Sequence, residues 1–128
     1  MNEPTWLTRS AIDAVHEELI ARFGGISGVR DEGLLESALA RPQQLFAYGA
    51  PTLFGCAAAY AHGIVKNHPF LDGTKRVGFM AAYTFLGVNG VEFSAPEVEV
   101  VIRTLALVAS ECSEEEYAAW LEQACRSE

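Results

Sequence analysis

Residues 67–76, with the sequence NHPFLDGTKR, hold the densest mixture of acidic, basic and cationic side chains in the chain. His68 is suited to act as a general base, because imidazole changes its protonation state near neutral pH. Asp72, four residues later, offers the hard oxygen ligands that Mg²⁺ prefers. Lys75 and Arg76 place two cations close to that carboxylate. These residue types together indicate a site for a negatively charged ligand.

The backbone that follows the carboxylate is also suited to an anion. Gly73 permits a close turn, and the next amides open a predicted helix over residues 75–88. A helix N-terminus has unpaired N–H groups and a partial positive charge, so the amides of Gly73 and Thr74 are expected to bind phosphate. Lys75 and Arg76 oppose the helix dipole unless an anion is bound there. A base, a metal carboxylate, an amide nest and two cations are the components of phosphoryl or nucleotidyl transfer.

The histidines also have other interpretations. His68 and Asp72 would suit a transition metal, but the sequence shows no further ligand cluster apart from His62, which is distant in register. His62 and His16 are expected to be structural histidines within the core helices. The prediction is therefore a phosphate and Mg²⁺ site with His68 as its base.

Two apolar segments, residues 57–65 and 77–86, must position this site. Segments that are apolar on every face are usually buried helices. A polar loop between two buried helices brings charge to a place where burial is unfavourable, and a function is the natural reason for it.

Capping signals and periodicity predict six helices in one compact all-α domain over residues 1–128. Thr8 caps the first helix, which continues to about Phe23, and Asp31 caps a second helix that Pro42 ends. The third and fourth helices cover roughly residues 52–66 and 75–88, and capping boxes at 94–97 and 113–116 start the fifth and sixth. The expected apolar faces are Ile12, Val15, Leu19 and Phe23 in the first helix; Val98, Val101, Ile102, Leu105 and Val108 in the fifth; and Tyr117, Trp120, Leu121 and Ala124 in the sixth.

Residues 42–51 are predicted to form an irregular loop between two prolines. Its side chains Leu45, Phe46 and Tyr48 either fold back on the core or belong to a flap over the site, because loops on a rigid scaffold often carry recognition. At most, a short strand pair is expected near Trp6 or residues 91–93.

Composition limits the class of protein. The chain has 128 residues, of which 50% are hydrophobic and 20% are charged, so it is long enough for one real core and is not a disordered chain. No apolar run reaches the ~18 residues that span a bilayer, and the N-terminus lacks the pattern of a secretory signal. The three cysteines have no metal-ligand spacing, which favours reduced thiols and a cytoplasmic location.

The net charge of −8 disfavours direct binding to nucleic acid, because an acidic domain repels phosphate backbones. Three cations nevertheless fall around the central loop, namely Lys66, Lys75 and Arg76. A local positive site in an acidic protein suits a small anion such as a nucleotide.

The segment His68–Arg76 resembles the signature of the Fic/Doc superfamily, whose pattern is His-x-Phe-x-Asp/Glu-Gly/Ala-Asn-Gly/Lys-Arg. Residues 28–42, with the sequence GVRDEGLLESALARP, resemble the upstream segment of the Doc branch. The two similarities cover roughly residues 16–90. They imply the Fic fold and an enzyme that uses ATP and Mg²⁺.

Two positions favour the Doc branch over the adenylylating Fic enzymes. Lys75 stands where those enzymes have Gly, and Phe79 stands where they have a second Arg. The resemblance therefore implies transfer of the γ-phosphate of ATP to a threonine of elongation factor Tu, which stops translation. His68 would take the proton of the hydroxyl, Asp72 would hold Mg²⁺, and Lys75 and Arg76 would stabilise the transferring phosphoryl group.

One residue departs from the family pattern, since Thr74 replaces the Asn that commonly helps to hold phosphate. Two alternatives therefore stay open: a catalytically degenerate module that chiefly binds an antitoxin, and a Fic-type protein adenylyltransferase. The internal Ser/Thr-x-x-x-Glu-Gly/Asn inhibitory motif is not found in the sequence. Control is expected from a Phd-like antitoxin whose disordered C-terminal tail folds into a groove.

Overall fold

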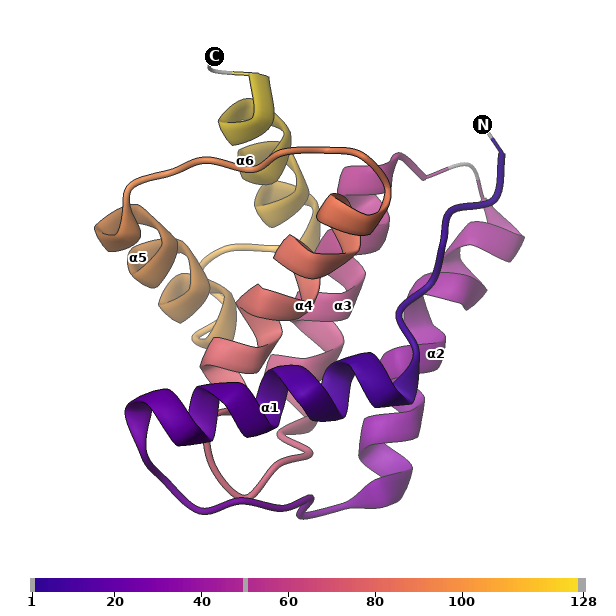
Figure 1. The fold of residues 1–128 in the computed structure, drawn as a ribbon. Helices are drawn as coiled ribbons and strands as arrows, with labels where there is room; N and C mark the ends of the chain where they lie inside the picture. Colours follow the sequence, from indigo (N-terminus) through magenta and orange to yellow (C-terminus); the bar gives the residue numbers. More distant parts are fainter. Residues whose placement is uncertain (1, 50, 127–128) are drawn as a thin grey trace.

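The computed structural model describes residues 2–49 and 51–126, and these form an all-α fold. The predicted fold class is confirmed, and no named strand occurs in the described part of the chain. The helices, labelled in Figure 1, are α1 (Arg9–Phe23), α2 (Glu32–Tyr48), α3 (Leu53–Asn67), α4 (Thr74–Val88), α5 (Glu97–Val108) and α6 (Glu114–Arg126). No helix among these residues is both long and apolar enough to cross a membrane.

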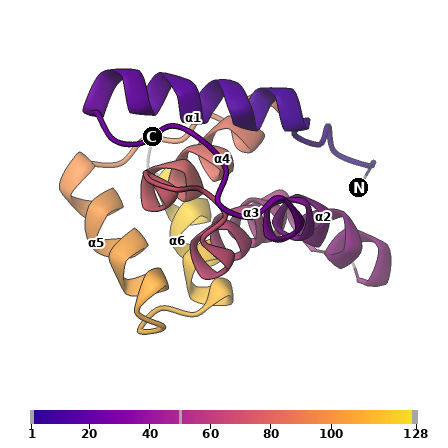
Figure 2. The same ribbon diagram turned by 90° about the horizontal axis from the view of Figure 1, so that it is seen from below.

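Helix α3 is the centre of the fold. It packs against α2, α4, α5 and α6. Helix α1 packs on α4; it runs across the front in Figure 1 and along the top in Figure 2. The predicted burial of residues 57–65 is confirmed, except that His62 remains partly exposed. Burial raises the pKa of Tyr60 to about 12 and that of Cys56 to about 11. The hydroxyl of Tyr60 accepts a hydrogen bond from the Leu7 N–H at 3.0 Å, so the core also fixes the segment before α1.

Most of the predicted helix starts are confirmed by their capping contacts. The Ala11 N–H donates to Thr8 Oγ1 at 3.0 Å, and the Leu34 N–H donates to Asp31 Oδ1 at 2.9 Å. At α6, the capping box of residues 113–116 forms in both directions. The box predicted at residues 94–97 is wrong, because Pro96 is the N-cap of α5 and no side chain caps that end.

Helix α2 does not end at Pro42. It continues to Tyr48, so the irregular loop predicted over residues 42–51 is wrong for residues 42–48, and residue 50 lies outside the described residues. The alternative that this segment covers the site stays a prediction. Proline inside a helix removes one backbone hydrogen bond and costs roughly 3 kcal/mol. Here Pro42 is fully buried, and Phe46 packs edge-on against Trp6 at 5.7 Å, so tertiary packing outweighs that local preference. Tyr48 is 91% exposed.

The apolar face predicted for α5 is mostly exposed, which corrects the expectation of a core-facing stripe. Val98 is 66% exposed and Ile102 is 60% exposed, whereas Thr104 and Leu107 are buried. Periodicity identifies an apolar face but not the partner that covers it. This face of α5 is therefore available to a ligand or another protein.

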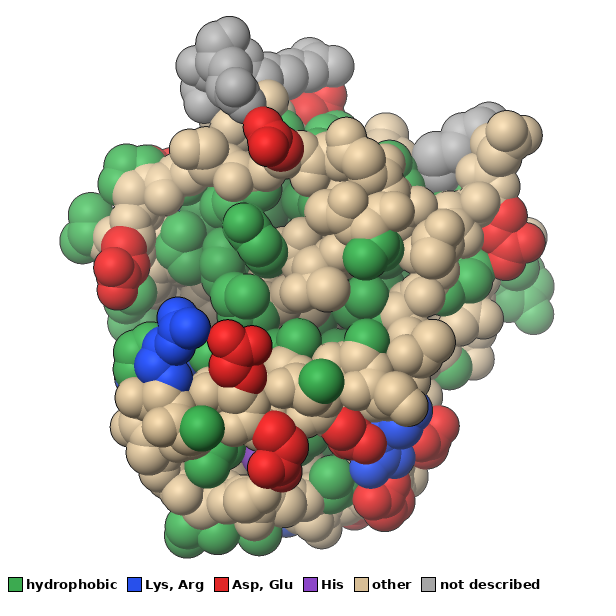
Figure 3. All heavy atoms as spheres, viewed as in Figure 1, with side chains coloured by type: hydrophobic (Ala, Val, Ile, Leu, Met, Phe, Trp, Pro, Cys, Tyr) green, Lys and Arg blue, Asp and Glu red, His purple; other side chains and the backbone are tan. Residues whose placement is uncertain are grey.

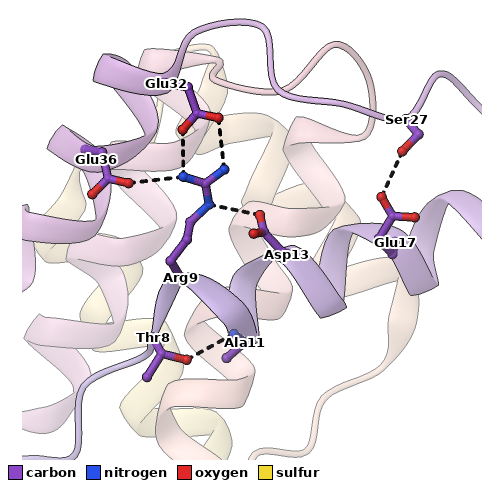
Figure 4. A network of polar contacts seen from close by, with 8 residues as sticks. All are labelled: Thr8, Arg9, Ala11, Asp13, Glu17, Ser27, Glu32 and Glu36. Atoms are coloured by element: carbon purple, nitrogen blue, oxygen red, sulfur yellow. Dashed lines mark hydrogen bonds and ion pairs between the residues drawn. The ribbon is translucent and has the colours of Figure 1, made fainter.

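An arginine on α1 connects that helix to α2 (Figure 4). Arg9 contacts Glu32 through two nitrogen atoms at 2.6 and 3.1 Å, and it also reaches Glu36 and Asp13. The hydrogen bond from Arg9 lowers the pKa of the Glu32 carboxyl. Bidentate arginine–carboxylate pairs have a defined geometry, so this network sets how α1 lies beside α2.

Candidate active site

The loop between α3 and α4 begins at a residue with unusual backbone geometry. His68 is the C-cap of α3 and has φ 49° and ψ 58°, in the left-handed region that few residues other than glycine adopt. Its N–H donates to the carbonyl oxygen of Ile64 at 3.0 Å, and its side chain is exposed. Such conformations are maintained by surrounding contacts and often occur at functional sites.

The segment before α2 braces this loop. Val29 and Phe70 form an antiparallel bridge, the Arg30 N–H donates to the Pro69 carbonyl at 2.7 Å, and the Leu71 N–H donates to the Gly28 carbonyl at 3.1 Å. Phe70 is fully buried and anchors the loop in the core. The two segments that carry the resemblance are therefore in direct contact.

The Arg30 side chain holds the end of α3. Its Nε donates to the carbonyl oxygen of His68 at 2.7 Å, and its Nη2 donates to that of Asn67 at 3.0 Å. A cation at a helix C-terminus also interacts favourably with the helix dipole. In the sequence, Arg30 is only one residue of the segment 28–42 that resembles the Doc branch. Spacing alone does not indicate that it reaches His68.

His16 is structural, as predicted, and it also supports the site. It is buried, its ring stacks on Phe70 at 4.2 Å, and its Nε2 lies 2.9 Å from the carbonyl oxygen of Asp72. His62 lies on α3 away from the loop. Its Nδ1 is 3.3 Å from a carboxylate oxygen of Glu114 but has no hydrogen-bond partner among the described residues, and burial lowers the pKa of this histidine.

Both carboxylate oxygens of Asp72 accept backbone hydrogen bonds. Oδ1 accepts from the Gly73 N–H at 2.9 Å, and Oδ2 accepts from the Ile26 N–H at 3.2 Å. The described residues contain no group of three or more His, Cys, Asp or Glu side chains that could hold a metal. A single carboxylate fits Mg²⁺ when phosphate and water supply the other ligands, whereas zinc requires more protein ligands.

The N-terminus of α4 has no side-chain cap. Gly73 is its N-cap, in a left-handed conformation, and Thr74 is the first helical residue. Lys75 and Arg76 are exposed in the first turn, and the Arg76 guanidinium lies 4.4 Å from the centre of the Phe23 ring. Lys66 is not part of this cluster, because it contacts the carbonyl of Val108 and the hydroxyl of Ser110 near the end of α5. Lys75 and Arg76 are thus the two cations in the first turn of α4.

A groove with a volume of about 860 Å³ leads away from these residues. The loop residues His68, Asp72, Gly73, Thr74, Lys75 and Arg76 all line it, so the structure brings the predicted site residues to one place. Its other walls come from α1, α4, α5 and the segment before α5. Figure 3 shows hydrophobic side chains gathered in this hollow, between α5 and α4 and above α1.

Phe79, in the position of the second Arg of the adenylylating enzymes, forms part of the groove wall. Its ring contacts Tyr83, Phe93 and Trp120, with centroid distances of 6.0, 5.5 and 6.5 Å. This position therefore contributes apolar surface to the groove.

Comparison with known proteins agrees with this arrangement. The sequence model of the Fic/DOC family matches residues 6–86. The chain belongs to the Fic/DOC family. The "Toxin Doc" of Mycolicibacterium smegmatis is 47% identical over 76 residues, which are 57% of this chain and 58% of that protein. The "Protein kinase doc" of Escherichia phage P1 is 38% identical over 87 residues, which are 66% of this chain and 69% of that protein.

These two relatives place the chain on the Doc branch of the Fic/DOC family. The family match includes α1, α2, α3 and most of α4, and so it contains the loop and its brace. It does not include α5 or α6, which form one wall of the groove and one side of the core.

Proposed function

We propose that this chain is a Doc-type toxin kinase that transfers the γ-phosphate of ATP to a threonine hydroxyl of another protein. The observation that best supports the proposal is the position of His68 at the uncapped N-terminus of α4, next to Asp72 and two exposed cations. The relative from Escherichia phage P1 is named a protein kinase, which supports the same reaction class.

In the proposed reaction, His68 accepts the proton of the attacking hydroxyl. That oxygen bonds to the γ-phosphorus while the bond from γ-phosphorus to the bridging oxygen breaks, and ADP leaves. The N–H groups of the first turn of α4, from Thr74 onward, with Lys75 and Arg76, stabilise the negative charge of the transferring group, whereas the Gly73 N–H already donates to Asp72 Oδ1. Asp72 would hold Mg²⁺, which neutralises phosphate charge and orients the nucleotide when it is bound.

The groove near Phe79 argues against adenylyl transfer. An arginine at that position would add a cation for the outer phosphates, whereas Phe79 lies in an aromatic cluster on the groove wall. Because Lys75 lies beside the first-turn amides and Phe79 supplies no second cation, we propose that the γ-phosphate of ATP binds next to Lys75 and Arg76.

We further propose that the target is a threonine of elongation factor Tu and that a Phd-like antitoxin controls the activity. The exposed apolar face of α5 supports the second part of this proposal, because Val101 and Leu105 are about half exposed and line the groove. A disordered tail could fold there as an amphipathic helix, covering the apolar wall and facing Lys75 and Arg76.

Radiolabelled ATP tests the reaction directly. The protein is incubated with elongation factor Tu and with ATP labelled at either the γ or the α position. We expect label on the factor from γ-ATP only, and His68→Ala should reduce that label by at least about 100-fold, the typical contribution of a general base. Circular dichroism should show that the variant remains folded, because the His68 side chain is exposed.

Each other outcome has a defined meaning. Label from α-ATP would establish an adenylyltransferase and exclude the kinase. No label from either nucleotide would favour a module that only binds its antitoxin. Full activity in a folded His68→Ala protein would exclude His68 as the base.

A further inference from the structure

The side chain of Thr74 contacts the proposed base. Its Oγ1 lies 3.0 Å from Nδ1 of His68. The two residues flank the loop, His68 at the C-cap of α3 and Thr74 at the first position of α4. This contact therefore joins the two ends of the loop through side chains.

Burial makes the contact significant. Thr74 is only 6% exposed, whereas the His68 side chain is exposed. Water competes less for a hydroxyl that is shielded from solvent, so the hydrogen bond between this hydroxyl and the imidazole is stronger. Thr74 is also β-branched and has few rotamers in a helix, so its oxygen is held in a defined position. An imidazole on a solvent-facing loop thus has one fixed, buried partner.

The contact also determines which ring nitrogen is available for chemistry. In a neutral imidazole one nitrogen carries the proton and the other accepts a hydrogen bond. If Nδ1–H donates to Thr74 Oγ1, the lone pair of Nε2 lies on the opposite edge of the ring. A base needs such a free lone pair, and the partner of the other nitrogen sets the tautomer.

We propose that Thr74 is a positioning residue for His68: its buried hydroxyl oxygen accepts a hydrogen bond from Nδ1–H and so keeps Nε2 unprotonated, ready to take the proton of the substrate hydroxyl. This inference rests on the proposed kinase function. It gives Thr74 a role that does not involve phosphate, because its side-chain oxygen is already engaged. Phosphate contacts then come from the first-turn amides of α4, Lys75 and Arg76.

The test compares Thr74→Val, which removes the hydroxyl but keeps the branched shape, with Thr74→Ser, which keeps the hydroxyl. We expect Thr74→Val to lower kcat by about 10- to 100-fold, within the range that a misplaced base loses, and to change KM for ATP by less than about twofold. Thr74→Ser should retain kcat to within about threefold. Thr84→Val, on the same helix but outside the groove lining, is the matched control and should leave kcat unchanged.

A spectroscopic measurement separates positioning from general packing. ¹⁵N NMR of the histidine rings reports which nitrogen carries the proton. For the wild type, we expect the Nδ1–H form at His68, and its fraction should fall in Thr74→Val and persist in Thr74→Ser and Thr84→Val. Melting temperatures would show that all variants are folded.

Several results would overturn the inference. One is an unchanged His68 tautomer in Thr74→Val, whether or not the rate falls. Another is a raised KM for ATP with normal kcat, which would make Thr74 a nucleotide ligand. If the wild type transfers no phosphate at all, the proposed function fails, and the tautomer measurement alone still decides whether Thr74 sets the state of His68.

Discussion

The carboxylate of Asp72, the proposed Mg²⁺ ligand, is closely approached by the backbone of the turn after α1. Gly25, in the turn after α1, has φ +119°, and a Cβ placed there would lie 2.7 Å from Asp72 Oδ2. The neighbouring Ile26 N–H donates to that same oxygen. A glycine at position 25 thus lets the turn approach the carboxylate closely enough to orient it.

We predict that Gly25→Ala displaces the Asp72 carboxylate, because the flexible end of this side chain moves more easily than the backbone. Kinase activity should fall by about tenfold or more, and the Mg²⁺ concentration for half-maximal activity should rise, as expected when a contact that orients a ligand is lost. Activity measured across a Mg²⁺ titration checks both effects.

Gly24→Ala is the matched control for that prediction. Gly24 also has a positive φ, +82°, but a Cβ there would meet nothing within 4 Å. Both substitutions therefore share a backbone strain of roughly 1–2 kcal/mol, and only one affects Asp72. Equal Mg²⁺ dependence in the two variants would show that Gly25 has no specific effect on the carboxylate.

The residue types in the loop indicate its chemistry from the sequence alone, but the sequence does not indicate which distant residues hydrogen-bond to the loop. His68, Asp72, Lys75 and Arg76 were recognisable because each type suits one chemical task. Nothing in their spacing indicated that Arg30 and His16, which are distant in sequence, bind the loop carbonyls. Those contacts depend on how α1 and the segment before α2 fold back on the loop.

At the scale of helices, the site depends on a close approach of α3 and α4. Gly78 on α4 faces α3, and a Cβ there would lie 2.7 Å from Cγ1 of Val65 and 3.4 Å from the Ala61 carbonyl oxygen. Small residues at such a crossing let two helices come close together. The two ends of the loop, His68 and Thr74, belong to these same helices.

We predict that Gly78→Ala lowers the free energy of unfolding by roughly 1–3 kcal/mol, because overpacking forces α3 and α4 apart. Gly87→Ala on the same helix should instead raise it by about 0.5–1 kcal/mol, since a Cβ there meets nothing within 4 Å and alanine favours the helix. Urea unfolding of both variants measures the difference. A stabilising Gly78→Ala would show that the interface has room for a methyl group.

Helix boundaries were predictable where the determining contacts are local. The Thr8, Asp31 and Ser113 caps involve residues at most three positions away, and all three formed as predicted. The end of α2 was not predictable, because the burial of Pro42 and the contact of Phe46 with Trp6 depend on tertiary packing. Local preference is a bias that tertiary contacts can overrule.

For the whole molecule, the main feature outside the loop is an apolar groove that ends at the site. The stripe on α5 was expected to face the core, yet it faces outward. The sequence pattern does not distinguish these two orientations, because an apolar helix face that binds another protein has the same periodicity as one that packs in the core. A partner in this groove would lie next to Lys75 and Arg76, and so binding and inhibition would be linked.

The two sides of α5 provide a direct test of that link. Val101 is 49% exposed and lines the groove, whereas Ile102 is 60% exposed and does not line it. We expect Val101→Asp to abolish co-purification with a co-expressed Phd-like antitoxin, because a buried, unpaired carboxylate is strongly unfavourable at an apolar interface. Ile102→Asp should leave co-purification intact.

Both variant proteins should fold, since both positions are exposed. In cells, the Val101→Asp protein should escape neutralisation and arrest growth. Equal binding by the two variants would place the antitoxin elsewhere on the molecule.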